Sequence, residues 1–310
     1  MQKPPSNSRA KKVTIALVCW NSFEMTAECI RNVLENTEYP NYEIIVIDNG
    51  SKDGSAPKLK KKFPFIRLIR NPENKGLPYA INQGYQEGKG FYLSHLNNDT
   101  RVLKGWLSAL VEAVEKDSKI GIAGLREVSK EEADNPEMLE KIRKIPDEDR
   151  YTLPIGWVVR RDVIEKVGFL DAENFSPVYG EEMDWNFRCR KAGFRVVRAS
   201  KANVVHFASR DSRENLGSEK QYVLQNLHRL RALLYNLPFW EIVRFFPGLA
   251  LVFLTALKDG RAGLLLKTYS LTLRDSKKIR EIRSRPRVYV GFKEPVFSQT
   301  GEKNGKVSQN

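Results

Sequence analysis

Cysteine and histidine are scarce in this chain of 310 residues, which contains only three of each. The three cysteines (Cys19, Cys29 and Cys189) are odd in number, and no two form a C-x-x-C pair. This pattern argues against a disulfide-stabilised secreted domain and against a cysteine zinc site. The basic N-terminal segment also lacks the apolar run of a secretory signal, so we expect a reducing, cytoplasmic compartment.

Three common functional motifs are absent as well. The sequence has no G-x-G-x-x-G after a strand, no G-x-x-x-x-G-K-[ST] and no G-x-S-x-G. A dehydrogenase-type dinucleotide fold therefore lacks its fingerprint, and neither a P-loop nor a hydrolase nucleophile elbow is present.

The whole chain has a net charge of +14, and its positive charge is concentrated in the last third. Residues 1–150 hold 24 Lys and Arg against 22 Asp and Glu, whereas residues 201–310 hold 20 against 9, an excess of 11. A polyanion or an anionic membrane is the natural partner of such a basic region.

Apolar β-runs alternate with helical patterns through the first 125 residues. Strands are expected at 13–20, 42–48, 66–70, 90–96 and 120–125, and helices at 22–37, 56–63, 74–88 and 102–117. This order predicts an α/β fold with a mostly parallel sheet between helices. Ligands of such sheets bind at the carboxyl ends of the strands, where loops 48–55 and 97–100 should face one crevice. The charged, poorly periodic stretch 127–150 should be a solvated insertion.

The strand at 90–96 ends on Asn97, Asn98 and Asp99. Asp99 or Thr100 could simply cap the helix expected to start near Val102. Three oxygen-bearing side chains at the ligand edge of a sheet also suit a hard divalent cation, especially one that binds phosphates.

Asp48 ends the buried strand expected at 42–48, in the sequence VIDNGSKDGS. Gly50 stands where a calcium loop needs an oxygen ligand, so that interpretation fails. A plain turn fits well, because Asn-Gly and Asp-Gly are common turn formers. The carboxylate of Asp48 is also placed to accept a hydrogen bond from the imide N–H of a uracil-type base.

A second acidic group, Glu181, Glu182 and Asp184, lies in the sequence YGEEMDW. It could be the start of a surface helix, where the helix dipole tolerates acids. Carboxylates crowded beside aromatic residues can instead have a raised pKa and act as a general base. His206 ends a short β-run and could be a metal ligand or a satisfied core residue, whereas His95 and His228 have no comparable context.

Taken in order, these elements resemble the inverting glycosyltransferases of family 2, which have the GT-A fold, and in particular their rhamnosyltransferase-like members. The similarity covers residues 12 to about 210. It rests on the segments IALVCWNS, IVIDNGSKDGS, NPENKGLPYAINQG, LNNDT, GEEMDWNFRCRKAGFRV and ANVVH. LNNDT stands at the D-x-D position of that family, and GEEMDW stands at its E-D-x-D position.

The resemblance implies a role for each matched residue. Asp48 would contact the base, and the backbone near Val18 and Cys19 would line the nucleoside pocket. Asp99 and His206 would bind Mn²⁺ or Mg²⁺ together with the diphosphate of the donor. The rest of the nucleotide-sugar site would comprise Asn21, Asn74, Gly76, Asn97 and Asn98.

Glu182 would be the catalytic base, supported by Glu181 and Asp184. The chain departs from the family at two of its positions. Asn97 replaces the first acid of D-x-D, which removes one negative charge from the metal site. Glu182 replaces an Asp and so lengthens the base by one methylene.

The implied activity is inverting transfer of one sugar from a nucleotide-diphosphate sugar to a glycan or lipid-linked acceptor. Processive members carry Q-x-x-R-W, but here Gln225 is followed by Asn226, Leu227 and His228, which favours a single transfer. The alternatives are a nucleotidyltransferase on a similar sheet and a basic nucleic-acid-binding protein. The latter leaves the acidic elements unexplained, so we expect no nucleic-acid partner.

The C-terminal third has the composition of a membrane-associating helical region. An amphipathic segment (222–238) precedes thirteen uncharged residues (245–257), which are too few to span a bilayer and are interrupted by Pro247. Residues 274–287 carry seven basic and two acidic side chains. We expect a helix that lies in the interface of the inner face of the cell membrane. The alternative is a helical subdomain packed on the catalytic core, or a dimer contact.

The expected division of the chain is therefore a disordered arm (1–11), a GT-A catalytic domain (12–215), a basic amphipathic helical region (216–290) and a tail (291–310).

Overall fold

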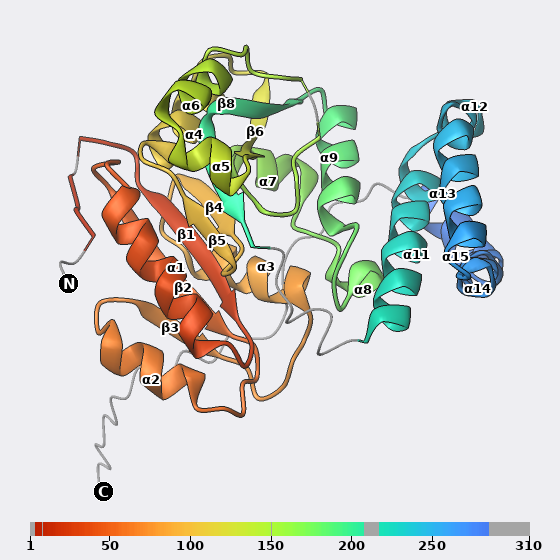
Figure 1. Cartoon of the computed structure of the whole chain (residues 1–310), viewed down its shortest axis with the longest axis horizontal. Coiled ribbons are helices and arrows are strands. Elements are labelled where there is room, and N and C mark those ends of the chain that lie inside the picture. The colour runs from red at the N-terminus through yellow and green to blue at the C-terminus, as the bar shows by residue number, and fades with distance from the viewer. Residues whose placement is uncertain (1–3, 8, 150, 208–216, 285–310) are drawn as a thin grey trace, which may run out of the picture.

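An eight-stranded mixed sheet forms the centre of the computed structural model, which describes residues 4–7, 9–149, 151–207 and 217–284. The strand order is β3-β2-β1-β4-β7-β6-β8-β5. Helices cover both faces of the sheet, and a group of C-terminal helices stands to one side (Figure 1). The strands are β1 (Val13–Cys19), β2 (Tyr42–Asp48), β3 (Arg67–Arg70), β4 (Tyr92–Leu96), β5 (Thr100–Val102), β6 (Ile120–Glu127), β7 (Gly156–Arg160) and β8 (Arg195–His206).

The first half of the sheet is parallel, as the sequence predicts, and the second half is mixed. Strands β3, β2, β1 and β4 run in the same direction. Strand β7 is antiparallel to both β4 and β6, and β5 is antiparallel to β8. Because β1 lies between β2 and β4, the loops that follow Asp48 and Leu96 flank the carboxyl end of the same strand.

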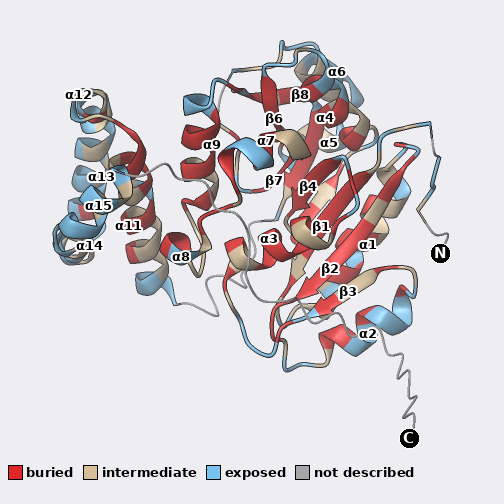
Figure 2. Cartoon of the chain, turned by 180° about the vertical axis from the view of Figure 1, so that it is seen from behind, coloured by how far each residue is buried: buried red, intermediate tan, exposed pale blue. Residues whose placement is uncertain are grey.

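Two apolar layers sandwich the sheet (Figure 2). Successive residues of a strand point to opposite faces, so Leu17 of β1 joins the layer that includes Trp106, and Ala16 joins the layer that includes Trp157 and Trp185. The helices of this region are α1 (Phe23–Asn36), α2 (Ser55–Lys62), α3 (Leu77–Glu87), α4 (Trp106–Glu115), α5 (Lys130–Asp134), α6 (Pro136–Arg143), α7 (Arg161–Val167), α8 (Ala172–Phe175) and α9 (Glu181–Lys191).

The helix expected from Val102 begins four residues later, and this boundary was wrong. Thr100 and Val102 are β-branched and form strand β5, in which Thr100 pairs with His206 of β8. Helix α4 starts at Trp106, with Gly105 in the left-handed conformation at its N-cap. Neither Asp99 nor Thr100 is therefore a helix cap.

The charged stretch after β6 is solvated, as predicted, but it contains two short helices. Neither α5 nor α6 has a buried residue. Helix α5 is stabilised by a capping box in which the Ser129 hydroxyl accepts from the backbone N–H of Glu132, and the Glu132 carboxylate accepts from that of Ser129.

The C-terminal helices pack on the body through the first of them. They are α11 (Ser218–Asn236), α12 (Phe239–Ile242), the 3₁₀ turn η1 (Val243–Phe245), α13 (Phe246–Lys258), α14 (Ala262–Arg274) and α15 (Ser276–Arg283). Helix α11 lies between α9 and the other C-terminal helices (Figure 1).

The apolar C-terminal segment is longer than its sequence suggested. Among the residues that the structure describes, one helical run of 20 residues, Phe239–Lys258, is long and apolar enough to cross a membrane by length and composition. Pro247 does not interrupt it, because it sits in the first turn of α13, where its missing N–H is not needed. Only 11% of its most apolar 18-residue window is buried.

The ends of the chain lie largely outside this description. Ser6 of the N-terminal arm forms an isolated bridge with Asn41, and the expected tail from 291 onward falls outside the described residues.

Candidate active site

The β5–β8 ladder brings the two expected metal ligands together. Thr100 pairs with His206, and the backbone N–H of Phe207 donates to the carbonyl oxygen of Asp99 at 3.0 Å. The Nε2 atom of His206 consequently lies 3.2 Å from Oδ2 of Asp99. Two residues 107 positions apart in the sequence thus form one carboxylate–imidazole pair at the end of the strands, in which Asp99 is buried and His206 is half-buried.

Glu127, which the sequence analysis did not select, adds a third group to this pair. It ends β6, and its Oε1 lies 3.7 Å from Nδ1 of His206. Burial works to lower the pKa of His206, but the hydrogen bond and charge of Asp99, together with Glu127, outweigh it and raise this pKa. A hollow of about 690 Å³ opens beside the pair, lined by residues that include Ser129, Lys130, Arg198 and Phe207.

The chemistry of the pair fits a divalent cation that a substrate helps to hold. A carboxylate and an imidazole are ligands that Mn²⁺ accepts, and Mg²⁺ commonly takes one or two protein carboxylates and completes its shell with phosphates and water. Among the described residues, no group of three or more His, Cys, Asp or Glu side chains is arranged to hold a metal alone.

Asp48 lies at the carboxyl end of β2 and is fully buried. Its Oδ1 accepts from the backbone N–H of Ser51 at 3.2 Å, and its Oδ2 lies 3.4 Å from Nε of Arg70. These contacts fix the carboxylate at the strand end and are also those of a turn, so both interpretations of Asp48 have a structural basis.

A network of amide side chains holds the loops around Asp48. Asn49 is buried; its Nδ2 donates to Oδ1 of Asn74 at 2.9 Å and to the Gly76 carbonyl at 3.2 Å. Its Oδ1 accepts from Nδ2 of Asn71, which in turn exchanges two hydrogen bonds with Gln83. Asn74 and Gly76 were expected in the site, whereas Asn49, Asn71 and Gln83 were not, because nothing in a run of polar loop residues reveals which amides are buried.

The end of β1 is tied to the same loop. Asn21 has a positive φ of 50°, its backbone N–H donates to the Ser51 hydroxyl at 2.9 Å, and its Oδ1 accepts from the Lys52 N–H at 2.8 Å. The carbonyl of Cys19 accepts from the backbone N–H of Asn49 at 2.8 Å. Val18 is half-buried beside it, so the backbone at Val18 and Cys19 borders the loop that carries Asp48.

The two asparagines before Asp99 already have protein partners. Asn97 Oδ1 lies 3.0 Å from Nε2 of the buried His95. Asn98 Nδ2 donates to the hydroxyls of Ser22 at 3.0 Å and Thr26 at 2.9 Å. In this structure both amides therefore position the Asp99 loop against its neighbours.

The acids Glu181 and Glu182 are the first two residues of α9. Burial and the charge of Glu182 raise the pKa of Glu181 well above its usual value. Burial also raises the pKa of Glu182, partly offset by backbone N–H groups and by the Arg229 guanidinium of α11. A pair of carboxyl groups with raised pKa values at a helix N-terminus is suited to accept a proton near neutral pH.

The loop before these acids contacts the loop that starts α3. The backbone N–H of Leu77 donates to the Pro177 carbonyl at 2.7 Å. Gly76 has a φ of +90°, and a Cβ there would lie 2.7 Å from Oγ of Ser176, so a side chain would force the two loops apart. Asn49, Gly76 and Pro177 thus link the Asp48 loop to the acidic group.

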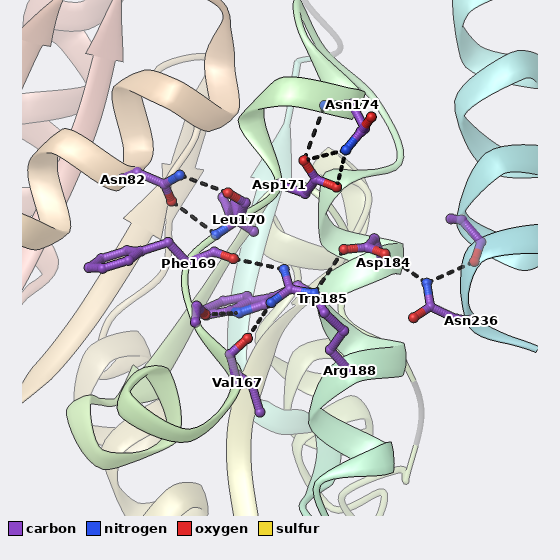
Figure 3. A network of polar contacts seen from close by, with 12 residues as sticks. Asn82, Val167, Phe169, Leu170, Asp171, Asn174, Asp184, Trp185, Arg188 and Asn236 are labelled. Atoms are coloured by element: carbon purple, nitrogen blue, oxygen red, sulfur yellow. Dashed lines mark hydrogen bonds and ion pairs between the residues drawn. The ribbon is translucent and has the colours of Figure 1, made fainter. Parts of the chain in front are cut away.

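Asp184, the third acid, lies in a different environment (Figure 3). It is fully buried; its Oδ2 accepts from Nε of Arg188 at 2.9 Å, and its Oδ1 accepts from Nδ2 of Asn236 at 2.7 Å. The Arg188 guanidinium also donates to the carbonyls of Val167 and Phe169. The contacts of Asp184 therefore join α9 to α11 and to the end of α7.

Comparison with known structures assigns the fold. The chain is similar to GalNAc-T7, solved with UDP, GalNAc and Mn²⁺, with a TM-score of 0.56 and 16% identity, over 73% of this chain and 48% of that one. It is also similar to the mannosyltransferase PcManGT from Pyrobaculum calidifontis, solved with GDP-Man and Mn²⁺, with a TM-score of 0.54 and 17% identity, over 91% and 86% of the two chains. The architecture is that of a GT-A glycosyltransferase.

Sequence comparison assigns the family. The model of glycosyl transferase family 2 matches residues 14–168, half of the chain. Glycosyltransferase AglE of Haloferax volcanii is 25% identical over 257 residues, covering 76% of this chain and 81% of the relative. Poly-beta-1,6-N-acetyl-D-glucosamine synthase of Staphylococcus aureus is 32% identical over 124 residues, which cover 39% of this chain and 30% of the relative. The protein belongs to glycosyl transferase family 2 and is a glycosyltransferase.

Proposed function

We propose that the protein transfers a single sugar from a nucleotide-diphosphate sugar to an acceptor hydroxyl, with inversion of the anomeric configuration and with the help of Mn²⁺ or Mg²⁺. The observation that carries this proposal is the Asp99–His206 pair at the carboxyl ends of the strands. The Asp48 loop follows a strand of the same sheet edge, and its region contacts the loop before a second acidic group, whose pKa values are raised.

Asp99 and His206 would hold the cation, which the donor diphosphate would also bind, and Asp48 would accept a hydrogen bond from the base. A bound divalent cation stabilises the negative charge that develops on the departing diphosphate. Glu182 takes the proton of the acceptor hydroxyl. The acceptor oxygen forms a bond to the anomeric carbon while the bond from that carbon to the diphosphate breaks, and a nucleoside diphosphate leaves.

The acceptor is a lipid-linked glycan or the precursor of a surface polysaccharide. The name of one relative supports this class, since it is a poly-beta-1,6-N-acetyl-D-glucosamine synthase. The absence of Q-x-x-R-W after Gln225 favours one transfer per encounter rather than polymer synthesis.

Product analysis tests the reaction class. The full chain is incubated with a panel of nucleotide sugars, with Mn²⁺, with Mg²⁺ or with excess chelator, and the nucleotide products are separated. The proposal predicts release of nucleoside diphosphate that depends on the metal. Release of pyrophosphate would instead identify a nucleotidyltransferase, and equal turnover in chelator would remove the metal from the mechanism.

The C-terminal helices bind the cytoplasmic face of the membrane in this proposal. Helices α12 and α13 expose large apolar side chains, of which Phe239 and Trp240 are each 72% exposed (Figure 2). Exposed basic residues surround them, among them Arg244, Lys258, Arg261, Lys267 and Arg274. Such a surface complements an anionic bilayer, to which each basic residue contributes about 1 kcal/mol.

One side of the same helices packs on the rest of the protein. These contacts favour an orientation in which α12 and α13 lie parallel to the membrane plane. Ile242 packs with Phe187 and Leu233, and Ala256 is 1% exposed where α13 meets α14. A bilayer-spanning arrangement would separate these contacts, whereas an interfacial arrangement preserves them.

Vesicle flotation tests this location. The full chain should float with anionic vesicles at low salt and only partly at high salt, because the apolar contribution is not screened. Leu254→Ser with Leu257→Ser should abolish the salt-resistant fraction. Met138→Ser with Ile145→Ser, which alters similarly exposed apolar residues on the solvated insertion, should float like the wild type. If neither wild type nor control binds vesicles, the C-terminal helices are a packing subdomain.

A further inference from the structure

The turn that precedes the acidic pair has an unusual backbone. Tyr179 and Gly180 both have positive φ angles, of 78° and 80°. A non-glycine residue rarely adopts this region and does so where its surroundings hold it. Because Gly180 is the N-cap of α9, this turn sets the direction in which Glu181 and Glu182 enter the site.

A histidine of the C-terminal region holds this turn. His228 of α11 is 1% exposed, and its Nδ1 lies 2.9 Å from the carbonyl oxygen of Val178 and 3.0 Å from that of Tyr179. Both partners are acceptors, so Nδ1 carries the proton and donates. Burial lowers the pKa of His228, which keeps the ring neutral in this tautomer.

Two further contacts from α11 hold the Tyr179–Gly180 turn. The Nε2 of Gln221 donates to the Tyr179 hydroxyl at 2.7 Å. A Cβ on Gly180 would lie 3.0 Å from both the backbone and the side chain of His228, so only glycine allows the helix to approach this closely. On the opposite side, the Leu77 N–H holds the Pro177 carbonyl, and the turn is fixed between α3 and α11.

We propose that His228 is a positioning residue of the sugar-transfer reaction: its Nδ1–H holds the Val178–Gly180 turn and thereby directs the Glu181–Glu182 pair at the acceptor. The inference rests on the proposed role of Glu182. In this proposal, helix α11 positions the acids of α9 and also supports helices α12 and α13. His228 does not itself contact the reacting atoms.

Three substitutions in the full chain separate positioning from packing. His228→Asn places an amide N–H near the position of Nδ1, His228→Gln places it near Nε2, and His228→Phe keeps the ring without a donor. We expect His228→Phe and His228→Gln to lower kcat roughly 10²-fold, the effect typical of a displacement of about 1 Å at a reacting group. The KM for the nucleotide sugar should change less than about threefold, and His228→Asn should recover most of kcat.

The matched control is Leu233→Ala, which alters a buried α11 residue that packs on Phe187, away from the turn. It should lower the melting temperature with kcat unchanged. Equal kcat for the Asn and Gln variants, or a loss of kcat in Leu233→Ala as large as in His228→Phe, would overturn the proposal.

Amide hydrogen exchange provides a readout that needs no activity. Residues 178–182 should exchange at least tenfold faster in His228→Gln than in the wild type and in His228→Asn, while the Asp99 loop is unchanged. If the wild type transfers no sugar but this pattern is observed, the proposed function fails and the positioning contact stands. Unchanged exchange in His228→Gln refutes the contact whatever the activity.

Discussion

The ion pair between Asp184 and Arg188 leads to a stability prediction that can be worked out from its contacts. Asp184 accepts hydrogen bonds from Arg188 at one carboxylate oxygen and from Asn236 at the other, and both ionic side chains are buried (Figure 3). Asp184→Asn leaves one oxygen for two donors and removes the charge that compensates the buried guanidinium.

The expected cost is that of breaking a buried ion pair from one side, about 3–5 kcal/mol of unfolding free energy. In a chain of this size each kcal/mol lowers the melting temperature by about 2–4 °C, so the total is on the order of 10 °C. Urea unfolding followed by tryptophan fluorescence measures the change, since Trp185 lies next to Asp184 on α9.

A reciprocal substitution gives the control. In Asp184→Asn with Asn236→Asp, the amide of residue 184 donates to a carboxylate on α11, and its oxygen still accepts from Arg188. This double variant should recover part of the lost stability. An Asp184→Asn protein within about 1 kcal/mol of the wild type would refute the view that this acid joins α9 to α11.

Two further predictions concern the site itself. The transfer rate should fall as the pH drops through the raised pKa of Glu182, because the base must be ionised. Arg229→Gln removes a positive charge that lowers this pKa and should shift the acidic limb of the pH–rate profile to higher pH, whereas an unshifted limb would show that Arg229 does not act on the base. Asp99→Asn and His206→Ala should each weaken Mn²⁺ binding in the presence of a nucleoside diphosphate, by at least the roughly 10–100-fold lost with an outer-shell partner, as measured by calorimetry. Asp162→Asn, which alters a carboxylate of α7 that pairs with Arg160, should bind normally, and equal affinities for all three variants would contradict the assigned ligands.

The parts of the fold that the sequence predicted are those with a strong local signal. Strands β1, β2 and β4 are largely apolar segments that are buried on both faces, and their bounds agree with the expected ranges to within two residues. Strand β5 has only three residues, too few to show a period, and it exists because β8 pairs with it.

The missed residues of the site depend on contacts between segments far apart in the sequence. Glu127 lies at the start of a charged stretch, where nothing in the sequence marks it as a site residue. The pairing of β6 with β8 brings its carboxylate next to His206. His228 had no local context because its partners, Val178 and Tyr179, lie 50 and 49 positions earlier. The uncharged run in the sequence begins only after Arg244. The helical run nevertheless extends back to Phe239 and includes the charged residues Glu241 and Arg244.

The most direct test of the account compares Glu182→Gln with the wild type in two measurements on the full chain, donor binding and single-turnover sugar transfer. The amide preserves the shape of the side chain but cannot take the acceptor proton. We predict a donor dissociation constant within about threefold of the wild type and a transfer rate lower by roughly 10²–10⁴-fold. A Glu182→Gln protein that transfers sugar at the wild-type rate would contradict the central claim that this carboxylate is the base of the reaction.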